Sequence, residues 1–175
     1  MTDVAASMSS NTKSLSVRDW AFPFVLGVIS AFVCAKWGHV LAELATKNVW
    51  KLDQTYTAGF GFLAVTTGFL ATFYATLQTA TDGFVQRIRI TKGHTLTKFL
   101  TLTKRTIVLG FVVALLSVPM MVATPVPQSD PLALATLASS IWFGATVWAV
   151  ASFYSVASVF FMLLETPASR RHGGG

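Results

Sequence analysis

Three ionisable side chains inside an apolar stretch are the residues best placed for chemistry. Lys36, His39 and Glu43 are three and four residues apart, so they share one stripe if this stretch is a helix. A charged group inside a membrane span is costly and often marks a proton relay or an ion pathway. Lys36 also lies about 25 Å along a helix from Asp19, close enough to the outer interface to reach water. The sequence leaves two interpretations open. The three residues form a proton relay, or Lys36 reaches the membrane interface and the residues form an ordinary side-chain pair on the helix surface.

Catalytic and metal chemistry have little support elsewhere in the chain. Cys34 is the one cysteine, which excludes an intramolecular disulfide and a Cys/Cys metal site. We interpret it as a small apolar residue in a helix rather than a redox or acylation site. The histidines are scattered, and the chain contains no G-x-S-x-G, no H-E-x-x-H and no phosphate-binding glycine loop. We therefore expect a non-enzymatic protein without a cofactor or a metal.

The elements that must position these residues are four long apolar stretches. Hydrophobic residues make up 53% of the chain and charged residues 11%, whereas soluble domains carry about 25% charge. About 20 apolar residues form a helix that crosses the hydrocarbon core, and continuous runs this few in number do not suit a barrel. The sequence predicts an all-α, four-helix transmembrane bundle over 20–166, with spans at about 20–45, 56–80, 106–123 and 132–164.

Two tails flank the predicted membrane domain. Residues 1–19 are rich in Ser, Thr and Ala, so we expect a disordered N-tail and a first helix that starts near Trp20. Residues 167–175 form a C-terminal tail that ends in three glycines, a pattern typical of an expression linker. No separate soluble domain is expected.

Basic residues are distributed unevenly around the spans, in a chain with a formal net charge of +6. Ten lie on the side of the termini and of the connection between the second and third spans: Lys13, Arg18, Arg87, Arg89, Lys92, Lys98, Lys104, Arg105, Arg170 and Arg171. Lys47 and Lys51 lie on the other side. Cytoplasmic loops carry an excess of Lys and Arg, so we expect both termini in the cytoplasm. This placement also argues against direct nucleic-acid binding.

Residues 81–105, between the second and third spans, are the main basic segment. We predict that helices 2 and 3 extend into the cytoplasm as a basic helical hairpin joined at Gly93; a strand hairpin that includes Val85–Ile90 is the alternative. The segment carries Arg87, Arg89, Lys92, Lys98, Lys104 and Arg105. These cations could dock anionic lipid or an acidic cytoplasmic partner, or they could act on topology alone.

Small residues recur at helical spacing on two of the spans. On the second span the set is Gly61, Ala64, Gly68, Thr72 and Thr76. On the fourth span it is Ala138, Ala145, Ala149 and Ser152. Such spacing lets helices approach closely, so we expect helix packing or an oligomer seam on these faces. The sequence does not decide whether the faces meet within one chain or between copies, or whether the threonines line a polar path.

The layout of Trp20–Glu165 combines a polar N-tail, a Gly/Ala/Thr-rich second span, a basic segment containing a glycine and a short outer loop before the last span. In this layout the chain resembles small bacterial four-span membrane proteins, such as the membrane subunit of the Kiwa phage-defence system. The resemblance implies an oligomeric inner-membrane protein that senses or breaches the membrane and works with a cytoplasmic partner. No functional residue is carried over from it.

Three functions remain open from the sequence. The first is a non-enzymatic, homo-oligomeric membrane sensor or pore-forming component with a cytoplasmic partner, in contact with membrane lipids and suited to antiviral defence. The second is a structural accessory subunit of a larger membrane complex. The third is a small ion or proton-coupled transporter that uses Lys36, His39 and Glu43.

Overall fold

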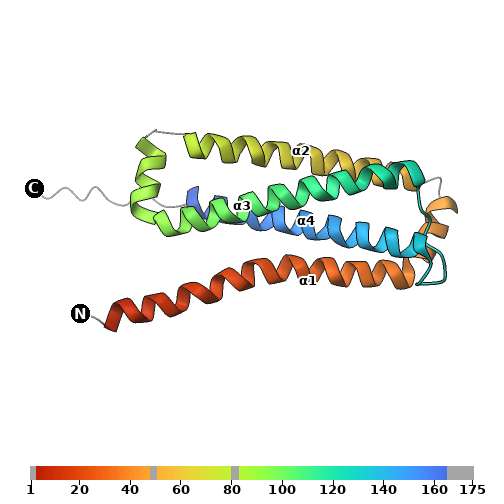
Figure 1. The fold of residues 1–175 in the computed structure, drawn as a ribbon, viewed down its shortest axis with the longest axis horizontal. Coiled ribbons are helices and arrows are strands. Elements are labelled where there is room, and N and C mark those ends of the chain that lie inside the picture. The colour runs from red at the N-terminus through yellow and green to blue at the C-terminus, as the bar shows by residue number, and fades with distance from the viewer. Residues whose placement is uncertain (1–2, 48–50, 80–82, 165–175) are drawn as a thin grey trace, which may run out of the picture.

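The computed structural model describes residues 3–47, 51–79 and 83–164, with side chains at 21–40, 42–43, 47, 51–79 and 96–161. Its four helices are α1 (Asp3–Lys47), α2 (Leu52–Thr79), α3 (Gly83–Ala123) and α4 (Leu134–Leu164). They run alternately up and down, so that α1 begins and α4 ends at the same end of the bundle (Figure 1). We call this the basic end and the opposite one the loop end. The all-α four-helix architecture is confirmed.

Each helix contains a stretch long and apolar enough to cross a membrane. These stretches are Ala21–Val40, Leu52–Thr79, Leu96–Ala123 and Leu134–Phe161. By length and composition the chain is therefore an integral membrane protein, as predicted. Within the third stretch the exposed large apolar side chains begin at Val108, close to the predicted start at 106.

Two predicted boundaries differ from the structure. α1 begins at Asp3 rather than near Trp20, so Pro23 lies inside the helix instead of in its first turn. No glycine or proline interrupts residues 3–22, and the helix of the span can therefore continue into them. Gly93 lies within α3 rather than between two helices; the first part of α3 crosses the basic end of the bundle, and the helix then bends to run back along α2 (Figure 1). The strand alternative is also wrong, because Val85–Ile90 are helical.

The helices pack in the order α1, α4, α3, α2. α4 packs along α1 and α3, whereas α2 packs along α3 and only slightly on α4. Glycines mark the closest approaches. A Cβ added to Gly27 would lie 2.8 Å from the carbonyl oxygen of Gly144, and one added to Gly144 would lie 2.7 Å from Cβ of Ala31. Gly110 of α3 likewise meets the hydroxyl of Thr67 of α2. Small residues allow this contact without a hydrophobic driving force between helices.

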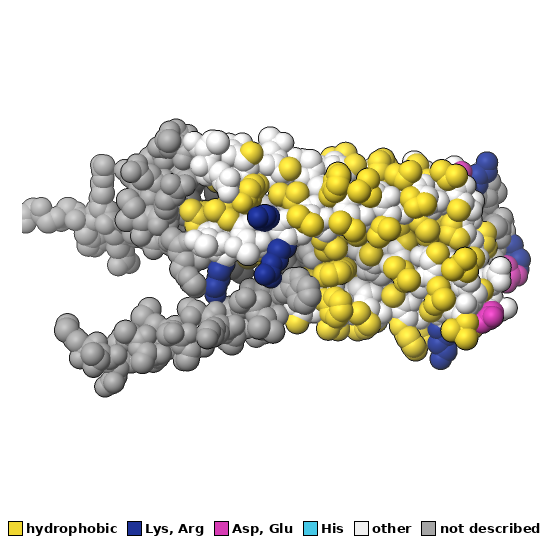
Figure 2. All heavy atoms as spheres, in the orientation of Figure 1, with side chains coloured by type: hydrophobic (Ala, Val, Ile, Leu, Met, Phe, Trp, Pro, Cys, Tyr) yellow, Lys and Arg dark blue, Asp and Glu magenta, His cyan; other side chains and the backbone are white. Residues whose placement is uncertain are grey.

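A belt of exposed apolar side chains surrounds part of the bundle. On α3 its members are Val108, Phe111, Val112, Leu115, Leu116, Val118 and Val122. None of the described residues 96–107 is an exposed large apolar residue, and Phe69 is the last one on α2. Figure 2 shows this hydrophobic surface between Lys and Arg side chains on one side and the charged loop end on the other. From Arg105 to Ala123 the helix rises about 27 Å, close to the thickness of a hydrocarbon core.

Beyond the belt, toward the basic end, α2, α3 and α4 continue together with an apolar core and a polar exterior. Leu70, Phe99 and Val156 are buried at its centre. The rings of Phe73 and Phe160 pack edge to face against each other, 4.9 Å between centroids. The exterior here carries threonines and lysines, so these helix ends suit water or lipid headgroups rather than acyl chains.

Candidate functional site

A groove lies between α1, α3 and α4. Its volume is about 780 Å³, within the range of small-molecule and lipid sites, and it opens on one side to the surroundings. α1 follows α4 and makes little contact with α3, so the two helices leave a gap whose floor is α4. The lining residues are Pro23, Thr101, Leu102, Lys104, Arg105, Thr106, Val108, Leu109, Val112, Trp148 and Ser152.

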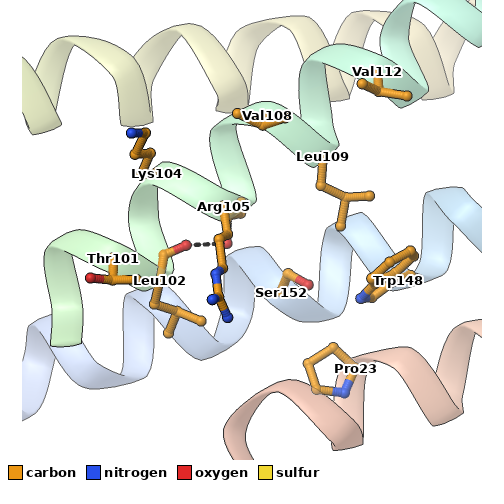
Figure 3. Close-up of a pocket in the computed structure, with 11 residues that line it drawn as sticks. Pro23, Thr101, Leu102, Lys104, Arg105, Val108, Leu109, Val112, Trp148 and Ser152 are labelled. Carbon is orange, nitrogen blue, oxygen red and sulfur yellow. Dashed lines mark hydrogen bonds between the residues drawn. The ribbon is translucent and has the colours of Figure 1, made fainter. Parts of the chain in front are cut away.

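The two ends of this groove differ in chemistry. At the basic end Lys104 and Arg105 are exposed, and Figure 3 shows Arg105 extending from α3 into the space between α3 and α1. Further along, Val108 and Val112 belong to the exposed apolar belt. No carboxylate lines the groove among the described residues. The groove therefore joins a cationic mouth at the edge of the belt to an apolar channel inside it.

The floor and one wall of the groove are well ordered by packing. Trp148 of α4 packs edge to face on Phe24 of α1, with ring centroids 5.2 Å apart. Ser152, one turn further along α4, is 6% exposed and also lines the groove. Figure 3 shows the Trp148 indole nitrogen on the side of the cavity. Sequence reasoning missed this arrangement, because Pro23 and Trp148 lie 125 positions apart and no local pattern connects them.

A second polar cluster closes the loop end. The Tyr56 hydroxyl donates to the carbonyl oxygen of Pro125 at 2.9 Å, and the Ser139 hydroxyl lies 3.1 Å from the same oxygen. Trp142 donates its indole N–H to Ser117 Oγ at 2.7 Å, and both side chains are buried. Because every one of these groups has a partner within the bundle, the cluster ties the 124–133 loop to α2 and α4 and has a structural role.

The structure gives Lys36 and Glu43 partners outside the predicted stripe of three ionisable residues on α1. Lys36 lies over the ring of Trp37, 5.4 Å from the centroid, and is exposed. Glu43 is exposed and accepts a 2.8 Å hydrogen bond from Lys47, which lowers the pKa of its carboxyl. His39 is half-buried, and its Nδ1 atom has no hydrogen-bond partner among the side chains that the structure describes. The geometry thus brings Glu43 to Lys47 and Lys36 to Trp37, an arrangement typical of interfacial anchors.

The small-residue stripe of α2 faces away from the other helices. Gly61 and Gly68 have nothing within 4 Å of an added Cβ, and Ala64, Thr72 and Thr76 are exposed. The hydroxyls of Thr72 and Thr76 donate to carbonyl oxygens one turn back in their own helix, at 3.0 and 2.9 Å. The stripe is therefore an outward face with satisfied polar groups, not a polar path through the bundle.

The small residues of α4 lie inside the bundle instead. Ala149 is 2% exposed and belongs to a core cluster with Leu63 and Val113, against which Ala145 packs. Ala138 packs on the cluster of Tyr56, Met120 and Trp142. Ser152 lines the groove. Within one chain these residues contact α2 and α3, while the tightest seam of α4 is its contact with α1 through Gly144.

The basic segment is only partly described. Lys98 is half-buried, and Lys104 and Arg105 are exposed at the groove. Arg87, Arg89 and Lys92 lie on the first turns of α3, and their side chains fall outside the described residues. Cys34 is half-buried on α1, with its thiol hydrogen-bonded to Ser140 of α4. Where side chains are described, no three His, Cys, Asp or Glu residues come together as metal ligands.

Comparisons with protein-family models, with curated proteins and with solved structures found no significant match. The function of the chain is therefore argued from its own residues.

Proposed function

We propose that this chain is a non-enzymatic, homo-oligomeric membrane protein whose copies meet through the outward face of α2. The observation that carries the proposal is the open space beside Gly61 and Gly68. Lipid-facing helix surfaces are usually covered by large apolar side chains, whereas small residues concentrate where helices pack. Of the residues in the most apolar part of α2, 11% are buried, against 33% in α3 and in α4, so α2 has the most surface left to cover.

The outward face is broad enough for a second helix. Ala71 and Ala75 are exposed beside Gly68, so the small surface extends over several turns toward the basic end. Phe62 and Phe69 flank it on one side with 48% and 65% exposure. A neighbouring α2 could place its backbone against the glycines and its own side chains against these rings. Both partners would then use the same surface, as a twofold interface requires.

Function as a sensor or a pore follows from assembly in this proposal. The axis of a single bundle is filled by Leu63, Val113 and Trp142, which are 1–5% exposed. A conducting path would therefore form between copies rather than through one chain. We place the basic end in the cytoplasm of a bacterial cell, where Lys98, Lys104 and Arg105 would meet a soluble partner or anionic lipid. Membrane-linked antiviral defence, which the layout of the chain suggests, is the proposed setting.

Native mass spectrometry of the detergent-solubilised protein, expressed alone, tests the assembly. We expect a defined oligomer for the wild type and a monomer for Gly68→Leu, because the larger side chain keeps the backbones apart. Gly68→Ala is the matched control and should keep the oligomer. Since no described residue lies within 4 Å of a Cβ at Gly68, Leu should not unfold the monomer, which the melting temperature checks. A wild-type monomer, or an oligomer in Gly68→Leu, would refute the α2 interface.

Conductance across a planar bilayer then separates a pore from a sensor. A pore requires conductance in the wild type and its loss in Gly68→Leu. A stable oligomer without conductance would favour the sensor.

A further inference from the structure

We propose that the groove between α1, α3 and α4 binds one anionic phospholipid, with its phosphate at Arg105 and an acyl chain along Val108 and Val112. This site is independent of the α2 interface, because none of its lining residues belongs to α2. The argument rests on the depth of the groove, on the charge of its mouth and on its shape.

The depth of the groove matches a lipid. The exposed apolar belt of α3 begins at Val108, three residues after Arg105, so the guanidinium lies at the level where headgroups replace acyl chains. The groove continues to Val112, about 10 Å further along the helix. A molecule that fills it must therefore be polar at one end and apolar at the other. A membrane supplies such molecules at high local concentration on the side to which the groove opens.

The charge of the mouth selects an anionic headgroup. The Arg105 guanidinium extends into the groove, whereas the Lys104 side chain points to the other side of α3 (Figure 3), and no carboxylate lines the groove among the described residues. The nearly buried Ser152 adds a hydroxyl group to the lining, whereas the Thr101 hydroxyl already donates to the carbonyl oxygen of Thr97 at 2.9 Å. Arginine presents a planar set of N–H donors that matches phosphate oxygens, and hydroxyls can complete the contact. Basic pockets between transmembrane helices on the cytoplasmic side have the chemistry to hold anionic lipid headgroups.

The shape of the groove favours one acyl chain rather than a flat lipid contact. The space lies between two helices that do not pack on each other, over a floor formed by Trp148 and Ser152. Its volume of about 780 Å³ is large enough for a drug-sized apolar ligand. Filling it would also cover the apolar side of α3 that α1 leaves open.

Titration of the purified protein with dioleoylphosphatidylglycerol or dioleoylphosphatidylcholine, read by native mass spectrometry in detergent, tests the proposal. We expect one phosphatidylglycerol to bind in preference to phosphatidylcholine. Arg105→Gln should weaken this binding about fivefold, whereas Lys104→Gln, whose side chain points to the other side of α3, should have a smaller effect. Arg105→Lys should keep most of the affinity. Lys51→Gln, an exposed cation at the loop end, is the matched charge control and should change nothing.

A second pair of variants tests the apolar part of the site. Val112→Trp should fill the groove and reduce lipid binding, whereas Val118→Trp lies outside it and should not; the two valines are 46% and 47% exposed. Because the titration is done in detergent, an effect of Arg105 on membrane orientation cannot mimic a loss of binding. Equal binding of the two lipids overturns the proposal, as does unchanged binding in Arg105→Gln or Val112→Trp. Displacement of the lipid by inorganic phosphate would assign Arg105 to free phosphate and also overturn it.

Discussion

The contact between α1 and α4 allows a sharp test, because a glycine-to-alanine substitution should lower the melting temperature at Gly144 of α4 and raise it at Gly61 of α2. In Gly144→Ala the new Cβ would lie 2.7 Å from Ala31 Cβ, and ordinary contact begins at 3.4 Å, so α1 must move away by about 0.7 Å. A gap of 0.5–1 Å forfeits about a quarter to a half of the dispersion energy of the atoms involved. Overpacking of this kind costs about 1–3 kcal/mol, and the better helix propensity of alanine returns about 1 kcal/mol.

We therefore expect a net loss of up to about 2 kcal/mol for Gly144→Ala, or up to about 8 °C in melting temperature for a chain of this size. Gly61→Ala is the matched control. Nothing lies within 4 Å of its Cβ, so only the propensity gain of up to about 1 kcal/mol remains and the melting temperature should rise. Intrinsic tryptophan fluorescence follows both transitions, and Trp148 lies at the altered contact.

Cys34 provides a second and local measurement. It is the one cysteine of the chain, it lies on α1, and its thiol is hydrogen-bonded to Ser140 of α4. If Gly144→Ala moves α1 away, a small maleimide should modify Cys34 faster than in the wild type, while Gly61→Ala should not change the rate. A Gly144→Ala protein with an unchanged or higher melting temperature and an unchanged rate at Cys34 would refute the close packing of these helices.

Two further predictions concern single hydrogen bonds. Ser117→Ala leaves the buried indole N–H of Trp142 without its 2.7 Å acceptor and should cost about 1–3 kcal/mol, whereas Ser158→Ala, near the surface, should change the melting temperature little. An equal melting temperature for Ser117→Ala and the wild type would contradict this. Glu43 has a lowered pKa in the folded state, so the contribution of its pair with Lys47 is present above the ordinary carboxyl pKa of about 4.3 and is lost as the pH falls through the lowered value. Because the pair is exposed, Glu43→Gln should leave the melting temperature at pH 7 nearly unchanged, and a clear decrease would contradict the assignment.

The number and type of the secondary-structure elements could be predicted, because lipid offers backbone N–H and C=O groups no hydrogen-bond partners outside the protein. A continuous apolar run must satisfy its own N–H and C=O groups, which in a chain with four such runs means four helices. Helix-breaking prolines correctly predicted where the third helix ends: α3 stops at Ala123, two residues before Pro125. Where lipid does not constrain the chain the predictions were poorer. The alternating segment Val85–Ile90 is helical because it continues the helix of the third span, an effect that its local pattern does not carry.

The pairing of the helices could not be predicted, and the small residues explain why. α2 and α4 both carry small residues at helical spacing, and the spacing is the same whether a face is buried or not. The side chains across the contact decide which face is used. Ala31 and Gly27 on α1 are small at the two positions where Gly144 approaches, so α4 packs closely there, whereas the described side chains place nothing beside Gly68 of α2. A stripe of small residues therefore predicts that another helix can pack closely against it. Only the structure shows whether a helix of the same chain does so. In this protein the small residues of α4 pack against other helices of the chain, whereas those of α2 face outward. Gly68→Leu therefore tests assembly, and Gly144→Ala tests the fold.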